Sequence, residues 1–359
     1  MIDLLFLGNF REFERCYRQH SRALHPEERD ELLAFYYLNT LKLARLQSLM
    51  KGGKLSERTV AQILFYLGYL KEARVRFLKL LERENLDRRT KAIVTMALDQ
   101  IEALRCGRPI SGYVPEGVLR EIHTYNRANF MAYTGDLDGA VRELRRAKEG
   151  AIRKGAEHLA LVCHVFSAFL SGSVADLELV MDTARRLKAY RLLLRTRIFL
   201  SFLKRESPPR VPKGYRYFRY LSHMVRETNA GREPVLLRDF AGMWNVFWYV
   251  HKVRDGITYL SFSGRLSLYR GREKVKIPKH LLITLAYLKA LGKEGVYEHA
   301  SLIFRRASVP IKRVWNNLSA LKPYAGIPTD MEIALRCGTF LSQEGEDWAE
   351  VLRERLLPQ

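Results

Sequence analysis

Apolar residues recur at helical spacing through most of the first two hundred positions, and one pattern of small and large residues occurs twice. The first copy consists of Ala61, Gly68, Ala73 and Phe77, and the second, with the same separations, of Ala128, Gly135, Ala140 and Leu144. Apolar positions three or four residues apart lie on one face of an α-helix. A glycine between two such stretches can adopt the left-handed conformation that ends a helix. We therefore expect two helical hairpins, each turning at its glycine.

The two copies lie 67 residues apart, which is close to twice the 34 residues of a tetratricopeptide hairpin. Weaker copies are present at Gly8 with Phe13 and Tyr17, and at Gly172 with Leu177, Met181 and Ala184. The stretch from Arg89 to Gly107 lacks these landmarks. Residues 1–206 resemble the tetratricopeptide repeat family, which implies an α-solenoid whose concave face binds a peptide, a small effector or another copy of the chain. Generic antiparallel helices are the alternative.

A break in this helical pattern occurs at residues 207–214, where three prolines and a glycine cannot continue a helix. Residues 215–227 then interleave aromatic residues with arginines. We favour a helix that packs its aromatic side chains and leaves its arginines in water, with stacking on single-stranded nucleic acid as the alternative. Residues 236–253, rich in tryptophan and phenylalanine, predict a buried helix. We assign 207–255 to basic, aromatic connecting helices.

Beyond residue 256 the helical pattern gives way to alternation. Between Tyr259 and Leu268, apolar residues fall on one side and serines and an arginine on the other, which predicts one half-buried strand. A turn at residues 270–272 leads into a second alternating stretch, which ends at Pro278. We expect these two strands to form a hairpin.

Three helical patterns follow, over residues 280–291, 296–306 and about 308–323. The second ends in Arg305 and Arg306, which suit the negative end of a helix dipole. The third is the candidate for insertion into a DNA groove. Its outer face carries Lys312, Arg313, Asn316 and Lys322, which combine cations for phosphates with a carboxamide for base edges.

A last alternating stretch, residues 333–342, predicts a second hairpin with Arg336 at or near its tip. A cation in that position can lie beside the minor groove or the phosphate backbone. The order of elements from residue 256 to the end is then hairpin, three helices, hairpin.

This order resembles the winged helix-turn-helix output domain of bacterial response regulators, and more closely that of the antibiotic-regulatory-protein (SARP) class of transcriptional activators. Their recognition helix reads V-x-x-H-I-S-x-L-R, and Val314 to Lys322 read VWNNLSALK. The family's wing ends in Gly-Tyr-x-Leu, and Gly338 to Leu341 read GTFL. The resemblance covers about the last hundred residues and implies that residues 256–359 form a DNA-binding domain.

The resemblance extends the candidate DNA-binding set along the third helix. Asn317 stands where the family commonly has histidine and is expected to contact the backbone. Ala320 replaces a contacting arginine, so any base contact it makes is apolar, as against a thymine methyl group. The full expected set is Arg305, Arg306, Lys312, Arg313, Asn316, Asn317, Ala320, Lys322 and Arg336.

The charge of the chain agrees with a polyanionic partner. The sequence has 61 basic and 39 acidic residues, a formal net charge of +22, which favours DNA, RNA or an anionic surface. Between Arg185 and Asp255 there are seventeen basic residues against five acidic ones. The strongest positive field is therefore expected where the helical region meets the carboxy-terminal domain.

Motifs for chemistry are missing from the sequence. Gly53-Lys54 and Gly292-Lys293 are not followed by serine or threonine, so neither forms a phosphate-binding loop, and no catalytic, metal or cofactor motif is present. The four cysteines are scattered, which agrees with a reducing, cytoplasmic location. No stretch is apolar for long enough to suggest a membrane segment.

Together these patterns predict a mostly α protein, with an N-terminal tetratricopeptide-like α-solenoid and a small α+β winged helix-turn-helix domain. We expect a cytoplasmic, non-enzymatic regulator of transcription that binds double-stranded DNA and senses a protein, an effector or a second copy of itself through its repeats. The alternative is a repeat-scaffold adaptor whose winged helix binds protein or RNA. Ala320, an apolar residue where the family has a contacting arginine, is the residue that favours this alternative.

Overall fold

The fold is taken from a computed structural model of the chain. The structure describes residues 10–53, 55–83, 86–106, 110, 115–232, 234, 237–254, 258–261, 267–271, 273–278, 282 and 334–336. The chain divides into two compact units, Met1–Phe130 with Leu137–Trp244, and Met131–Asp136 with Asn245–Gln359. The described residues are mostly helical and include a small sheet, which confirms the predicted fold class at that level.

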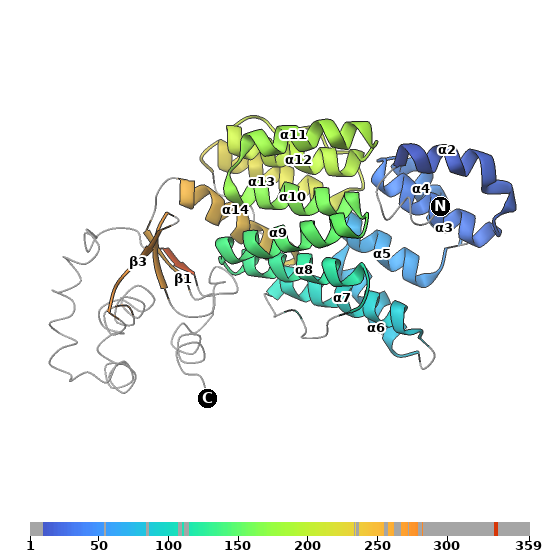
Figure 1. The fold of residues 1–359 in the computed structure, drawn as a ribbon, viewed down its shortest axis with the longest axis horizontal. Helices are drawn as coiled ribbons and strands as arrows, with labels where there is room; N and C mark the ends of the chain where they lie inside the picture. Colours follow the sequence, from blue (N-terminus) through green and yellow to red (C-terminus); the bar gives the residue numbers. More distant parts are fainter. Residues whose placement is uncertain are drawn as a thin grey trace. The chain divides into compact units, whose positions relative to one another are not determined.

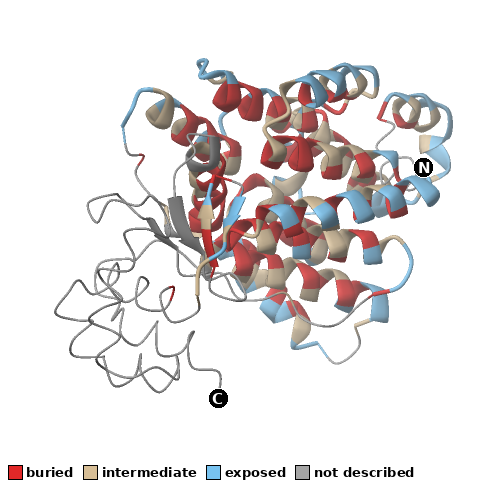
Figure 2. Cartoon of the chain, turned by 60° about the vertical axis from the view of Figure 1, so that its left-hand side comes forward, coloured by how far each residue is buried: buried red, intermediate tan, exposed pale blue. Residues whose placement is uncertain are grey.

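Helices make up the first unit (Figure 1). Their bounds are α2 Phe10–His20, α3 Pro26–Asn39, α4 Leu43–Lys51, α5 Glu57–Leu67, α6 Leu70–Leu81, α7 Arg88–Cys106, α8 Leu119–Tyr133, α9 Leu137–Arg153, α10 Glu157–Ser171, α11 Val174–Arg186, α12 Tyr190–Lys204, α13 Arg216–Asn229 and α14 Ala241–Arg254, with 3₁₀ turns at Ser21–Ala23 and Arg238–Phe240. Helices α8 and α14 continue into the second unit. Buried residues lie along the facing sides of neighbouring helices, and exposed residues lie on their outer sides (Figure 2).

Both copies of the repeated pattern form helical hairpins, as predicted. Gly68 ends α5 and Gly135 follows α8, and both have a φ of 90°. The other landmark residues of both copies are completely buried. Gly172 ends α10 in the same left-handed conformation, whereas the stretch without landmarks is the single long helix α7. Gly8 lies outside the described residues, and membership of the tetratricopeptide family stays a prediction.

Helices at the two ends of the first unit contact each other. Helix α3 packs on α12, and α13 packs on both α12 and α5. In an ideal solenoid each repeat contacts only its neighbours. The array in this protein therefore differs from the simple solenoid that the sequence suggested, because its last helices also cover its first ones.

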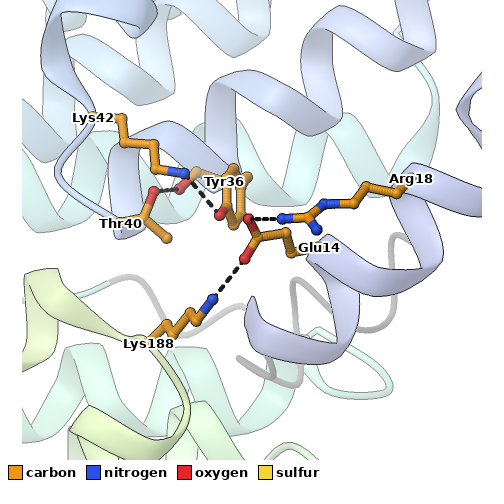
Figure 3. A network of polar contacts seen from close by, with 6 residues as sticks. All are labelled: Glu14, Arg18, Tyr36, Thr40, Lys42 and Lys188. Atoms are coloured by element: carbon orange, nitrogen blue, oxygen red, sulfur yellow. Dashed lines mark hydrogen bonds and ion pairs between the residues drawn. The ribbon is translucent and has the colours of Figure 1, made fainter.

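One polar network joins these ends (Figure 3). The ammonium of Lys188, in the turn between α11 and α12, donates to the carboxylate of Glu14 in α2 at 2.7 Å. Arg18 donates to the other oxygen of the same carboxylate at 2.8 Å. The pKa of Glu14 is lowered from 4.5 to about 2, and the hydrogen bond from Lys188 is the largest cause. Burial alone would raise this pKa, and the bond from Arg18 lowers it further towards the same value.

Close approach of two backbones fixes α13 on the end of α5. A Cβ atom placed on Gly68 would lie 2.6 Å from the backbone nitrogen of Tyr217. Any side chain at residue 68 would therefore displace α13. Residue 68 must be glycine for two reasons: its φ is positive, and the contact with Tyr217 leaves no room for a side chain.

The sheet of the second unit contains four short strands, β1 Thr258–Ser261, β2 Ser267–Arg270, β3 Glu273–Val275 and β4 Ala334–Arg336, in the order β3-β2-β1-β4. The single strand expected between Tyr259 and Leu268 is wrong, because β1 and β2 are separate strands that pair antiparallel. Leu260 pairs with Leu268. Residues directly opposite each other in a sheet point to the same face, so a hairpin satisfies the same apolar alternation as one continuous strand.

We expect Gly68→Ala to lower the free energy of unfolding by about 2–4 kcal/mol, because backbone strain is added to displacement of α13. Gly53→Ala is the matched control, since Gly53 also has a positive φ, of 69°, but an added Cβ would meet no atom within 4 Å. It should cost only about 1 kcal/mol. Urea unfolding followed by circular dichroism measures both. Equal losses would show that the contact with Tyr217 contributes nothing.

We expect Glu14→Gln to lower the free energy of unfolding by about 1 kcal/mol at neutral pH, a value reduced by solvent screening of this partly exposed pair. Because folding lowers the pKa of Glu14 from 4.5 to about 2, the contribution is complete above pH 4.5 and is lost as the pH falls towards 2. The difference between wild type and variant in urea unfolding should therefore shrink across that interval. A constant difference from pH 6 to pH 2 would contradict an ionic contribution.

Candidate nucleic-acid interface

The β2–β3 hairpin is the best described part of the candidate DNA-binding unit. Arg270 pairs with Glu273, so the chain reverses between these two residues, and Gly271 lies in the turn. Gly271 has a φ of 57°, as tight hairpin turns require. This confirms the predicted hairpin and its turn. Leu268 is completely buried, so the hairpin has an apolar anchor at its base.

Cations surround the tip of this hairpin. The side chains of Arg270, Lys274 and Lys276 are exposed, and one acidic residue, Glu273, is exposed among them. The net charge at the described tip is therefore positive. Such a surface attracts phosphates but carries no sequence information by itself.

A helical turn begins where the strands end. The backbone N–H of Leu282 donates to the carbonyl of Pro278 at 3.0 Å, and Leu282 is buried. Leu282 belongs to the first of the three predicted helices, residues 280–291, and this bond agrees with that prediction. The rest of that predicted helix, and the two that follow it, lie outside the described residues.

The chain returns to the sheet at β4, which pairs with β1 in parallel, with Leu335 opposite Leu260. Two parallel neighbours require a connection that crosses from one end of the sheet to the other. The segment with the three predicted helices lies within that connection. The sheet thus brings the first strand of the candidate domain beside residues 334–336.

Arg336 is the one predicted DNA-binding residue that the structure describes. It is the last residue of β4 and pairs with Ser261 of β1. The sequence placed it at or near the tip of a hairpin, whose turn and second strand, from residue 337 onwards, lie outside the described residues. The other eight predicted residues also lie outside them: Arg305, Arg306, Lys312, Arg313, Asn316, Asn317, Ala320 and Lys322.

The basic, aromatic segment after the prolines packs within the first unit. Tyr215 is completely buried and its hydroxyl donates to the carbonyl of Leu38 at 3.0 Å. Phe218 and Tyr220 of α13 are also buried, while Arg219 is exposed. The packing interpretation is confirmed for these aromatic residues, and they cannot serve as a stacking surface for single-stranded nucleic acid.

A second group of polar residues in the first unit was not identified from the sequence. Arg191 and Arg195 of α12 lie beside residues of four other helices. We call this group the arginine cluster: Tyr66 of α5, Tyr125 of α8, His158 of α10, Arg191 and Arg195 of α12, and Tyr217 of α13. The one signal in the sequence was a pair of arginines four residues apart, a spacing that places both on one face of a helix.

Within the described residues, histidine, cysteine and acidic side chains form no group of three that could hold a metal ion. Among the described helices, none combines the length and the apolar composition needed to cross a membrane.

Comparison with known proteins adds no family assignment. No protein-family model, curated protein or solved structure matches this chain.

Proposed function

We propose that the protein is a cytoplasmic, DNA-binding regulator of transcription in which residues 256–359 bind promoter DNA. The observation that carries this proposal is the arrangement around the small sheet. A hairpin with a cationic tip is followed by a helical turn at Pro278, and the chain later returns as β4 beside β1. A winged helix-turn-helix has this framework, with its recognition helix between the hairpin and the returning strand.

The charge of the chain supports the same proposal. A formal net charge of +22 favours association with a polyanion, and salt-dependent binding to phosphates would follow from it. Lys312 and Arg313 would contact the backbone, and Asn316 would contact base edges. Arg336, at the end of β4, would contribute a further cation.

The helical unit would serve as the regulatory part of such a protein. Its helices carry no sequence motif for chemistry, and repeat arrays commonly bind a protein, a peptide or an effector. A repeat-scaffold adaptor that uses the carboxy-terminal unit to bind protein or RNA is the second candidate. Ala320, an apolar residue on the expected recognition face, is the specific observation that favours it.

Selection of genomic DNA fragments by the full chain at near-physiological salt tests the proposal. We expect enrichment of fragments that share a sequence, and a loss of affinity of about 10- to 100-fold when Arg313 and Asn316 are both changed to alanine. Arg153→Ala is the control, since Arg153 is an exposed cation of α9 in the first unit. It should leave the enriched sequence unchanged.

Failure to enrich any fragment would contradict DNA recognition. Recovery of a protein partner at high salt, together with the absence of a DNA footprint, would favour the adaptor instead. Equal, weak binding of all fragments would show electrostatic attraction without sequence recognition.

A further inference from the structure

Two positive charges lie in the arginine cluster, and no carboxylate in the described part of the chain balances them. Arg195 donates to two tyrosine hydroxyls, those of Tyr125 at 3.0 Å and Tyr217 at 3.3 Å. Arg191 lies over the ring of Tyr66, 4.5 Å from its centroid. Neither guanidinium forms an ion pair with any acidic side chain in the described part of the chain. An arginine stays protonated when buried, so it cannot lose this charge by releasing a proton.

The neighbouring groups do not supply a negative charge. Burial and, as the smaller cause, the charge of Arg191 lower the pKa of His158 to about 4, so this imidazole is neutral at pH 7. Burial raises the pKa of Tyr66 and of Tyr217, so both phenols stay protonated. The cluster therefore carries two positive charges and no negative one among its members.

Contacts with aromatic rings offset only part of the cost of this arrangement. Arg195 lies 5.9 Å from the ring centroid of Phe166 and 5.8 Å from that of Phe199, at the long end of the range for cation–π attraction. Two like charges four residues apart on one helix repel each other. Removing charges from water without an ionic partner is unfavourable. The two guanidinium charges are therefore not neutralised by any member of the cluster.

Hydrogen-bond donors in the cluster are also left over. The Nε–H groups of Arg191 and Arg195 are buried and have no hydrogen-bond partner among the described residues. The hydroxyls of Tyr125 and Tyr217 accept bonds from Arg195, so each keeps its hydrogen to donate. Buried polar atoms are normally paired in folded proteins. A bound oxyanion would accept hydrogen bonds from these unused donors and would balance the two neighbouring positive charges.

The cluster lies between the core and the surface of the first unit. Each of its six residues is half-buried, although they come from five helices. A small molecule can contact residues that face one another in this way, whereas duplex DNA binds to fully exposed cations. The tyrosine rings of the cluster would also contact an apolar part of the same ligand.

We propose that the arginine cluster is the binding site for a small molecule that carries an oxyanion group, a phosphate or a carboxylate. The guanidinium groups of Arg191 and Arg195 bind the oxyanion, and the hydroxyls of Tyr125 and Tyr217 donate to it. Arginine forms paired, planar hydrogen bonds with both groups. This assignment does not rest on DNA binding by the carboxy-terminal unit, and either can fail alone.

Thermal unfolding and titration calorimetry of the full chain test the site, with inorganic phosphate, phenyl phosphate and benzoate as probes. We expect a phosphate or carboxylate probe to raise Tm by about 2–5 °C at concentrations about tenfold above its Kd. The phosphate and carboxylate arms identify which oxyanion is preferred. The difference between phenyl phosphate and inorganic phosphate measures the contribution of an aromatic group.

Arg191→Gln is the decisive variant, because Arg191 has no hydrogen bond to lose among the described residues. Without ligand it should raise Tm by about 2–4 °C, since an unbalanced charge is removed. It should also weaken binding of the probe by about 10- to 100-fold. Arg197→Gln is the matched control: Arg197 lies in the same helix but is exposed, and its change should leave both Tm and binding unaltered.

Three results would overturn the proposal. One is the absence of binding by all three probes to the wild-type chain. Another is an equal loss of binding in Arg197→Gln, which would show general attraction to a basic surface. The third is a lower Tm for Arg191→Gln without ligand, which would show that the guanidinium stabilises the fold instead of serving a ligand.

Discussion

The absence of a side chain at residue 68 is the constraint on which the arrangement of the first unit depends. Helix α13 reaches the end of α5 only because nothing stands between Gly68 and the backbone of Tyr217. That contact places the Tyr217 hydroxyl beside Arg195. One glycine therefore links the packing of the helices to the polar chemistry between them.

Some of this fold could be predicted from the sequence and some could not, for physical reasons. Landmarks such as Ala61 and Phe77 report local helical geometry, and they are buried as expected. The division between β1 and β2 was missed because opposite residues of a hairpin, Leu260 and Leu268, obey the same alternation as one strand. A turn inside an alternating stretch leaves no trace in the apolar pattern.

The arginine cluster shows the limit of sequence reasoning more clearly. Its members come from five helices that are far apart in the chain, so only the spacing of Arg191 and Arg195 was visible. The sequence could suggest that these two arginines share a face of α12. It could not show that Tyr125 and Tyr217 would be their neighbours and that no described carboxylate would pair with them.

The bond between Lys188 and Glu14 spans 174 positions of the chain. During synthesis, α2 emerges long before the turn that carries Lys188, so for most of that time the Glu14 carboxylate can pair only within its own helix, with Arg18. Helix α12, on which α3 packs, is likewise synthesised long after α3. The amino-terminal helices are thus made first but complete their packing among the last, and contacts of such long range are slow to form.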